Sequence, residues 1–411
     1  MKLKTLNILI NSYACGPNWG SEVGMGWHWV TALANHCQLY VITELGFKDD
    51  IEKKIPELNL KFQPKFYYVD IGDTGRTLFW KQGSFKFYKY YKAWQKKALL
   101  TANKIIKTEN IDLIHQLNMI GFREPGYLWS ILEKPYIIGP LGGIDNFPSS
   151  FMGYLPIKNR VFTFLKNNYS NFQFNYFKRF KNACHRASVI FTATNDGYNR
   201  LRHIHGLKVK LLNETGCESK PLTLTSKNFE GTLKILWVGR MEERKALDLA
   251  LDSLARVNDS IDYTLTIVGD GPLESYYKKM IIDKNLTSKC DWKGRIPNDE
   301  VQQLMKESDL FLFTSLREGT PHVVTEALQN GLPVICHNAC GHGSVVTETC
   351  GLKIEMINPS ESVTMFYNQI VKINQDRKLL KQLSEGALKR AEEISWDNKA
   401  KDMFKIYKSL V

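Results

Sequence analysis

Glu318 and Glu326 are eight positions apart in the segment REGTPHVVTEAL, on either side of a Gly-Thr-Pro turn. The segment Asp309–Phe313, apolar after its first residue, predicts a mostly buried strand, and residues 322–329 predict a helix. Carboxylates at a strand end and in the next helix can accept hydrogen bonds from a sugar's vicinal hydroxyls, and the helix's first-turn N–H groups can bind an anion between them. A capping acid and a solvated helix acid would give the same pattern.

Two cations follow an earlier predicted strand. Leu233–Val238 reads as a buried strand, Arg240 comes two residues after it, and Lys245 begins the next predicted helix. Open α/β sheets bind ligands beyond the carboxyl ends of their strands, so fixed positive charge there suits a phosphate. The same order of strand, glycine-rich turn and helix recurs at 269–271. We therefore expect three strand-to-helix loops along one sheet edge.

The first half of the chain opens on a similar unit. A short apolar strand at Leu6–Asn11 leads into a glycine-rich loop in which Gly20 and Ser21 precede a helix. Such a loop can bring backbone N–H groups close to phosphate. The loop is not a Walker motif and lacks Gly-x-Gly-x-x-Gly, so an ordinary turn remains an alternative.

His115 follows the predicted strand Ile111–Ile114, where we expect its side chain to enter a cleft. The alternative is a strand-end histidine that is hydrogen-bonded to backbone. Further on, Gly142 and Gly143 permit close approach of a ligand or form a simple loop. Asp145 reads as a helix cap and not as a catalytic group.

Strands alternate with helices through the whole 411-residue chain. This alternation predicts an α/β protein with two Rossmann-like, doubly wound parallel sheets that face each other across a cleft. A chain of 411 residues is too long for one compact core and long enough for two domains. We expect domains at 1–212 and 213–392, followed by an amphipathic helix at 393–411 that returns to the first domain.

Taken together, these motifs resemble the retaining glycosyltransferases of family 4, which have the two-domain GT-B fold. The resemblance implies that Arg240 and Lys245 bind the donor's diphosphate, that Glu318 binds the donor sugar's hydroxyls, and that Glu326 binds the ribose. It also places Ile296, in the segment DWKGRIP, beside the base. The turn and helix between the glutamates complete the implied donor-binding set with Thr320, Pro321, Val324 and Thr325.

The first half carries further implied roles. A Gly-Ser-Glu loop is similar to the family branch in which this segment faces the donor diphosphate, which assigns Gly20 and Ser21 to that group. Many members have Gly-Gly at these two positions. By the same resemblance His115 lies beside the donor sugar and Arg123 faces the acceptor.

The implied reaction is hexosyl transfer with retention, from a nucleoside diphosphate sugar to a hydroxyl of a cell-surface polysaccharide, a lipopolysaccharide or a lipid-linked saccharide. Two fixed cations would neutralise the departing diphosphate, so no metal or other cofactor is expected. In such enzymes the departing phosphate oxygen is thought to accept the acceptor's proton. The alternatives are a non-catalytic nucleotide-sugar-binding scaffold and an inverting GT-B transferase, for which His115 is the candidate base.

The net charge of +13 is unevenly spread. Neither Asp nor Glu occurs from Arg76 to Lys107, or between Asp145 and Asp196, and both runs are rich in Phe, Tyr, Lys and Arg. Segments 76–107 and 158–186 would suit an anionic inner-membrane surface or a pyrophosphate-linked lipid. Packed helices with aromatic side chains in the core and solvated lysines are the alternative. Nucleic acid is not an expected partner, because no known nucleic-acid-binding motif occurs.

The eight cysteines include no Cys-x-x-Cys pair. We expect free thiols in a reducing cytosol and no zinc site. The apolar run Leu6–Ile10 is too short for a signal sequence, and no run approaches the length that spans a bilayer. The expected location is the cytoplasm, with peripheral attachment to the cytoplasmic face of a membrane as a further expectation.

Overall fold

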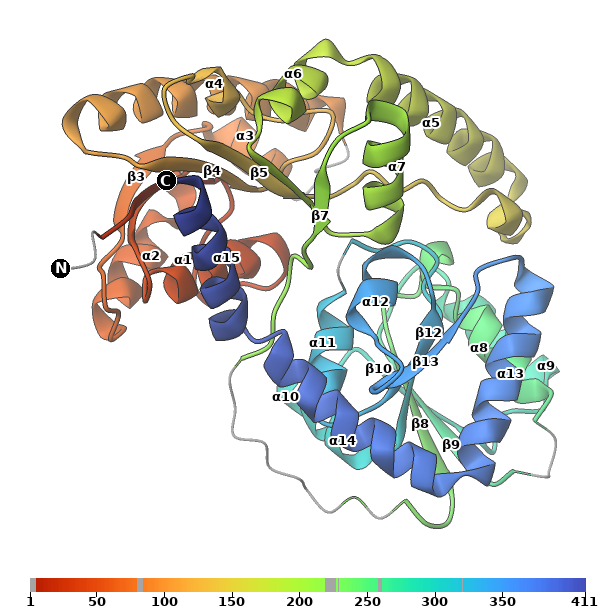
Figure 1. The fold of residues 1–411 in the computed structure, drawn as a ribbon. Helices are drawn as coiled ribbons and strands as arrows, with labels where there is room; N and C mark the ends of the chain where they lie inside the picture. Colours follow the sequence, from red (N-terminus) through yellow and green to blue (C-terminus); the bar gives the residue numbers. More distant parts are fainter. Residues whose placement is uncertain (1–4, 80–83, 219–226, 228, 258–260, 320) are drawn as a thin grey trace. The chain divides into compact units, whose positions relative to one another are not determined.

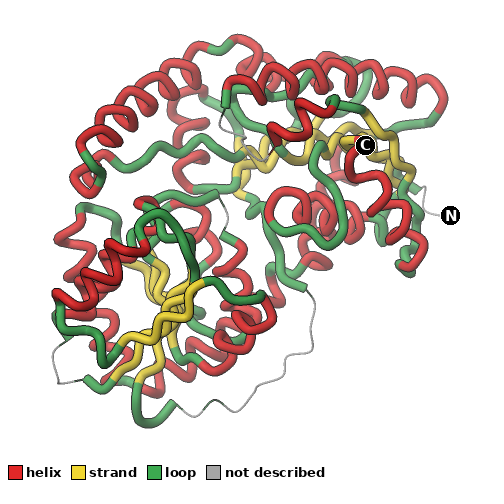
Figure 2. The backbone as a smooth tube through the Cα atoms, turned by 180° about the vertical axis from the view of Figure 1, so that it is seen from behind, coloured by secondary structure: helices red, strands yellow, loops and turns green. Residues whose placement is uncertain are grey.

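The computed structural model describes residues 5–79, 84–218, 227, 229–257, 261–319 and 321–411. They form two compact units (Figure 1). Unit 1 comprises residues 1–144, 171–214 and 396–411, and unit 2 comprises residues 145–170 and 215–395. In Figure 2 each sheet, drawn in yellow, has helices on both of its faces. Each unit is therefore a separate doubly wound α/β structure, as the alternation of strands and helices predicts.

The sheet of unit 1 has seven parallel strands in the order β3-β2-β1-β4-β5-β6-β7. Its strands are β1 (Asn7–Ser12), β2 (Gln38–Glu44), β3 (Lys65–Val69), β4 (Leu113–Asn118), β5 (Tyr136–Leu141), β6 (Val189–Thr192) and β7 (Val209–Leu211). Its helices are α1 (Ser21–Leu33), α2 (Lys48–Lys54), α3 (Asp73–Leu78), α4 (Phe85–Thr108), α6 (Lys178–Arg186), α7 (Asn195–His205) and α15 (Trp396–Leu410). Helix α5 (Ile157–Tyr176) has its first residues in unit 2 and its last six in unit 1.

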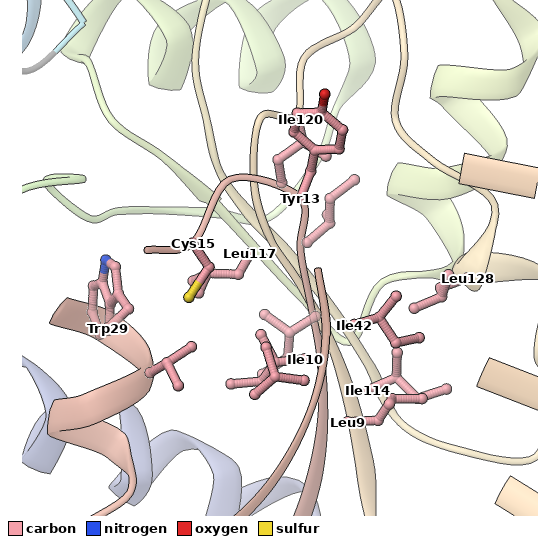
Figure 3. Close-up of a cluster of buried hydrophobic side chains, with 14 of the residues drawn as sticks. Leu9, Ile10, Tyr13, Cys15, Trp29, Ile42, Ile114, Leu117, Ile120 and Leu128 are labelled. Atoms are coloured by element: carbon pink, nitrogen blue, oxygen red, sulfur yellow. The ribbon is translucent and has the colours of Figure 1, made fainter. Parts of the chain in front are cut away.

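The core of unit 1 surrounds the central strands β1 and β4. Leu9 and Ile10 of β1 and Ile114 of β4 are fully buried (Figure 3). Successive side chains of a strand point to opposite faces, so burial of both neighbours Leu9 and Ile10 requires cover on both faces of the sheet. The predicted amphipathic terminal helix supplies part of that cover as α15, which packs on α1. The Trp396 ring stacks on His28 with 5.2 Å between centroids.

The sheet of unit 2 has six parallel strands in the order β10-β9-β8-β11-β12-β13. Its strands are β8 (Leu233–Val238), β9 (Tyr263–Val268), β10 (Cys290–Gly294), β11 (Leu310–Phe313), β12 (Val334–His337) and β13 (Gly351–Ile354). Its helices are α8 (Leu247–Ala255), α9 (Glu274–Asp283), α10 (Asn298–Glu307), α11 (His322–Gln329), α12 (Cys340–Val345), α13 (Pro359–Gln375) and α14 (Arg377–Glu393).

The two faces of this second sheet carry separate cores. In β11, Leu310 and Leu312 join the core formed with α8 and α13. Phe311 and Phe313 join the core formed with α11 and α14. This alternation with a period of two is what a strand buried on both faces requires. It also explains why residues 310–313 read as one continuous apolar run.

Residues 145–170 group with unit 2 in the structure, whereas the sequence analysis assigned them to the first domain. Phe147, Phe151 and Leu155 are buried in the unit 2 core and hold the segment there. The expectation that Asp145 caps a helix is wrong, because the next helical turn begins at Ser149 with Pro148 as its N-cap. An isolated Asp after a glycine pair resembles a cap in sequence, but here the chain stays irregular for three more residues.

All eight cysteines are free thiols. Seven are buried, and Cys290 is half-buried. Among the helices that the structure describes, none combines the length and the apolar character needed to cross a bilayer.

Candidate functional site

The strand order of unit 2 defines the position of its candidate site. The chain moves from β8 to β9 and β10 on one side, and from β11 to β12 and β13 on the other. In open parallel sheets ligands bind where the order reverses, beyond the carboxyl ends of the strands. The loop after β8 carries Arg240, Arg244 and Lys245, and the loop after β11 carries Glu318. The predicted cations and one predicted carboxylate thus follow the two strands that flank this point.

Glu318 is the centre of an ion network. Arg244 Nη1 lies 2.6 Å from Glu318 Oε1, and Lys245 Nζ is paired with the same oxygen. The Ser315 hydroxyl donates to this oxygen at 2.8 Å. Arg244 Nη2 also contacts Glu242 Oε1 at 2.6 Å. The side chains of Lys245 and Glu318 are only 12% and 13% exposed, so water screens this ion pair little.

Hydrogen bonds join the two loops behind the network. Trp237 Nε1 donates to Thr314 Oγ1 at 3.1 Å, and Thr314 Oγ1 donates to the Lys245 carbonyl at 2.9 Å. The Leu316 N–H donates to the Arg244 carbonyl at 2.8 Å. The backbone carbonyls of Arg244 and Lys245 are therefore hydrogen-bonded to the residues that follow β11. Such fixed positions let charged side chains act on a ligand without rearrangement.

Burial and neighbouring charges have opposite effects on the pKa of Glu318. Burial raises the pKa of its carboxyl, but the charges of Lys245 and Arg244 and the hydrogen bonds outweigh it, and the pKa lies below its ordinary value. Burial lowers the pKa of Lys245, and Glu318 opposes that effect. Glu318 is consequently a carboxylate near neutral pH, held between two cations and able to accept hydrogen bonds from a ligand.

Arg240 lies at the margin of this network. Its side chain is 67% exposed, and its Nε is 3.9 Å from Glu242 Oε2. Arg240 and Lys245 are the predicted pair of cations, whereas in the structure Arg244, which was not predicted, contacts Glu318 directly. Arg244 immediately precedes Lys245 in the sequence, but spacing alone does not distinguish it from Arg240.

Two further residues near the network, Arg317 and His342, were not predicted as site residues. Burial lowers the pKa of the Arg317 guanidinium, and the nearby charge of Arg244 acts in the same direction. His342 of α12 is fully buried, with its ring 5.1 Å from that of Phe313. Within the described part of the chain, neither ring nitrogen of His342 has a hydrogen-bond partner. Burial lowers the pKa of His342 to about 4, so its imidazole is neutral at pH 7.

The second glutamate, Glu326, lies in α11, which has the predicted bounds His322–Gln329. Burial raises the pKa of Glu326, and a hydrogen bond with Gln302 opposes this. Pro321 is the N-cap of α11, and its carbonyl accepts the Val324 N–H at 3.1 Å. Val324 and Thr325 are buried, and the Thr325 hydroxyl donates to the His322 carbonyl at 2.7 Å, so their contacts with a donor stay a prediction. Thr320 lies outside the described residues.

Ile296 follows β10, at the outer edge of the sheet and two strands away from β8. Its side chain is half-buried. Between β10 and β8, the loop after β9 approaches the loop after β8 closely. A Cβ on Gly269 would lie 1.9 Å from the Gly239 carbonyl oxygen, and Gly269 has a φ of +131°. Only glycine fits there, which lets the loops after β8 and β9 pack together.

In unit 1 the glycine-rich loop leads into α1 as predicted. Gly20 is the N-cap, and beyond its chain neighbours no atom of the described residues lies within 4 Å of the position that its Cβ would take. Ser21 is exposed and has a φ of +54°. The next residue, Glu22, has a buried Oε2 that finds no hydrogen-bond partner within the described residues. Burial raises the pKa of Glu22 to about 7, against a backbone hydrogen bond from Met119.

The structure contradicts the expectation that His115 points into a cleft. Strand β4 starts two residues later than predicted and continues to Asn118, so His115 is an interior strand residue with 0% exposure. Its Nδ1 lies 2.6 Å from Tyr407 Oη, and its Nε2 lies 2.8 Å from the Gly139 carbonyl. Burial lowers the pKa of His115 to about 4. Both ring nitrogens are engaged, so the geometry gives no support to a role beside a sugar.

The roles expected of Arg123 and Gly142 in unit 1 stay predictions. Arg123 lies over the Phe122 ring at 4.4 Å, and its Nε donates to Gln173 Oε1 at 3.0 Å. A Cβ on Gly142 would lie 2.8 Å from Glu214 Oε1, so this glycine allows a carboxylate to approach the backbone.

The two basic aromatic segments differ in structure. In segment 76–107, Phe87, Tyr91 and Trp94 of α4 are buried in the unit 1 core, so the packed-helix alternative holds for them. Trp80 and Lys81 lie outside the described residues. Segment 158–186 contains α5, most of whose aromatic side chains are exposed.

Comparison with known proteins supports the interpretation of unit 2 most directly. Residues 224–390 match the sequence model of the family described as Glycosyl transferases group 1. An uncharacterized glycosyltransferase of Methanocaldococcus jannaschii is 27% identical over 176 residues, which are 43% of this chain and 48% of the relative. The UDP-Gal:alpha-D-GlcNAc-diphosphoundecaprenol alpha-1,3-galactosyltransferase of Escherichia coli is 34% identical over 123 residues, 29% of this chain and 30% of the relative.

The chain spans less than half of the length of the curated relatives that it matches first. Likeness in structure extends further. The structure of HepE of Anabaena in complex with UDP and glucose aligns with 98% of this chain and with 100% of the HepE chain. The TM-score is 0.56 and the sequence identity is 15%. This likeness, with the two parallel-sheet units, shows the GT-B fold that was predicted.

Proposed function

We propose that the protein is a retaining glycosyltransferase that uses a nucleoside diphosphate sugar as donor. The observation that carries the proposal is the network of Arg244, Lys245 and Glu318 at the point where the strand order of unit 2 reverses. It combines cations for a diphosphate with a carboxylate for sugar hydroxyls. The match of residues 224–390 to a glycosyltransferase family and the UDP bound to HepE support the same assignment.

In the proposed reaction, the bond between the anomeric carbon and the diphosphate oxygen breaks, and the acceptor's hydroxyl oxygen bonds to that carbon. Negative charge develops on the departing diphosphate, where Arg244 and Lys245 would stabilise it, with Arg240 at the margin. The departing phosphate oxygen takes the acceptor's proton, so the reaction requires no protein base. Glu318 would hold the sugar by its hydroxyls, and Glu326 would bind the ribose.

The acceptor that we propose is a hydroxyl of a cell-surface glycan or of a lipid-linked saccharide. The name of the E. coli relative specifies a diphosphoundecaprenol-linked saccharide as its acceptor. A pyrophosphate-linked lipid carries negative charge, which suits a chain of net charge +13. The location that we propose is the cytoplasm, at the surface of a membrane.

The first experiment identifies the donor. Purified protein is heated with UDP-, GDP- and ADP-sugars, and a rise in melting temperature marks the bound donor. The experiment is repeated with Mg²⁺ and with EDTA. We expect the same stabilisation in both, because protein cations would neutralise the diphosphate. A shift that requires Mg²⁺ would overturn the proposed metal independence.

The second experiment tests the reaction itself. Transfer or slow donor hydrolysis is followed with the donor so identified, and NMR of the product gives its anomeric configuration. Retention supports the proposed mechanism, and inversion contradicts it. Binding without transfer or hydrolysis would instead favour a non-catalytic nucleotide-sugar binder. Lys278→Met is the control for substitutions that remove the charge of Lys245 or Arg244. Lys278 is a half-exposed lysine paired with Glu274 on α9.

A further inference from the structure

Helix α5 presents its apolar side chains to solvent. Six of them recur at intervals of three or four residues and are between 50 and 77% exposed: Ile157, Val161, Leu165, Tyr169, Phe172 and Tyr176. At 3.6 residues per turn, this spacing forms one stripe along the helix. Phe162 and Phe164, also more than half exposed, flank it. The helix can be followed in Figure 1.

The opposite side of α5 is polar and forms hydrogen bonds with other parts of unit 2. Asn159 Nδ2 donates to Glu243 Oε1 at 3.0 Å, and Asn167 Nδ2 donates to the Phe147 carbonyl at 2.8 Å. Ser170 continues this side and is buried. An ordinary surface helix buries its apolar stripe and exposes its polar one. In α5 the apolar stripe is exposed instead, while on the polar side Ser170 is buried and Asn167 is half-buried. Contiguous exposed apolar surface of this kind marks an interaction site.

The charge around the stripe selects the partner. No acidic residue occurs between Asp145 and Asp196, and Lys158, Arg160 and Lys166 lie on α5 itself. A second copy of this helix would bring like charges together, which is unfavourable. An anionic lipid surface attracts the cations and accepts the apolar side chains between its headgroups. Helix α4 offers no comparable stripe, because its aromatic residues Phe87, Tyr91 and Trp94 are buried.

We infer that α5 is a docking helix that lies in the plane of an anionic membrane, with its apolar stripe inserted among the lipids. The inference rests on the location given under the proposed function, a membrane surface, and identifies the element that binds there. Its test is separate from that of the reaction, because membrane binding requires neither donor nor acceptor. The inference specifies the surface by which the chain meets a lipid, namely the residues of α5 and not those of α4.

The test is co-sedimentation of the full chain with vesicles of phosphatidylcholine alone or with about one-third phosphatidylglycerol. We expect at least tenfold tighter binding to the anionic vesicles, since each cation near such a surface contributes about fivefold in affinity. The triple variant Phe162→Ser, Phe164→Ser, Leu165→Ser should bind at least tenfold more weakly than the unsubstituted chain. The control variant carries Leu100→Ser, Leu132→Ser and Ile282→Ser, three equally exposed apolar positions elsewhere, and should bind normally.

Three results would overturn the inference: equal binding to both kinds of vesicle, equal losses in the two triple variants, or no binding by the unsubstituted chain. Sedimentation velocity without lipid examines self-association. If the chain dimerises and only the α5 variant is monomeric, while neither binds vesicles, the stripe is an interface between copies.

A second readout does not depend on bulk affinity. An environment-sensitive fluorophore is attached at Phe164→Cys in a Cys290→Ser background, because the other seven native cysteines are buried. Its emission should rise and shift to the blue with anionic vesicles. The same label at Leu132→Cys should not respond. A response at both positions, or at neither, contradicts insertion of α5.

Discussion

At the scale of single residues, the contacts of Glu318 rank the cations around it. Arg244 and Lys245 both bind its Oε1, whereas the ion pair that Arg240 forms among the described residues is with Glu242, at 3.9 Å, and its side chain is 67% exposed. An exposed charge interacts more weakly through water than a buried one. The ranking leads to a prediction that separates the two arginines, which the sequence alone does not.

We expect Lys245→Met and Arg244→Met each to reduce turnover by about tenfold to a thousandfold, because each removes charge from the departing diphosphate. Arg240→Met should have a smaller effect than either. Steady-state kinetics with the identified donor measures these changes, and the melting temperature of each variant reports its folding. A larger loss in Arg240→Met than in Arg244→Met would contradict the ranking.

The buried imidazole of His115 predicts that the stability of the fold depends on pH. Its pKa of about 4 in the folded chain is below the ordinary value of 6.5, because burial disfavours the charged ring. Protonation therefore favours the unfolded chain. The stability contributed by the neutral ring is fully present above about pH 6.5 and is lost as the pH falls to about 4, with a size of about 3 kcal/mol.

The variant His115→Gln should unfold at lower urea concentration than the unsubstituted chain at pH 7.5, because Tyr407 and the Gly139 carbonyl lose a ring partner. Between pH 7.5 and pH 4.5 the variant should lose less of its free energy of unfolding than the unsubstituted chain does. Urea unfolding at both pH values gives the comparison. Equal pH dependence in the two proteins would mean that His115 does not carry this effect.

At the scale of elements, α4 and α5 have similar basic and aromatic composition but opposite packing. Trp94→Ala on α4 should destabilise unit 1 by about 3–5 kcal/mol, the usual cost of removing a buried aromatic side chain. Phe162→Ala on α5 should cost less than about 0.5 kcal/mol, as expected for an exposed position. Denaturant unfolding followed by circular dichroism measures both. A large loss in Phe162→Ala would show that the α5 stripe is covered.

Sequence patterns predicted the elements whose ends have local signals. Strand β8 and helix α11 have the predicted bounds, because an apolar run ends at Gly239 and Pro321 marks the start of the helix. The strand that contains His115 was misplaced. Its register is set by pairing with β1 and β5, and its burial depends on Tyr407, which is 292 positions away. Such long-range contacts have no local signal in the sequence.

The candidate site was predictable in its types of residue and less so in its contacts. Lys245 and Glu318 were both selected, and the structure pairs them. Arg244 was overlooked because side-chain direction in a short turn does not follow from spacing. The outward apolar stripe of α5 was also beyond composition alone, since composition does not tell which side of a helix the rest of the chain covers. Asn159 and Asn167 reveal it only through their partners.

At the scale of the whole molecule, the chain folds as two units with separate cores and crosses between them more than once. Unit 1 is completed by α15, the last helix in the sequence. Tyr407 of α15 is fully buried in the unit 1 core, and Phe366 of α13 is fully buried in the unit 2 core. These two aromatic residues are matched probes of whether the cores respond independently.

Tyr407→Ala should raise amide hydrogen exchange in β1, β4 and α1, because it removes a core ring and the partner of His115. Exchange in β8 and β11 should stay close to that of the unsubstituted chain. Phe366→Ala should give the reverse pattern, with faster exchange around α8 and α13. Hydrogen-exchange mass spectrometry of the full chain resolves both patterns. If either substitution accelerated exchange equally in both units, the two cores would unfold as one cooperative structure, and the division into separate units would have no thermodynamic counterpart.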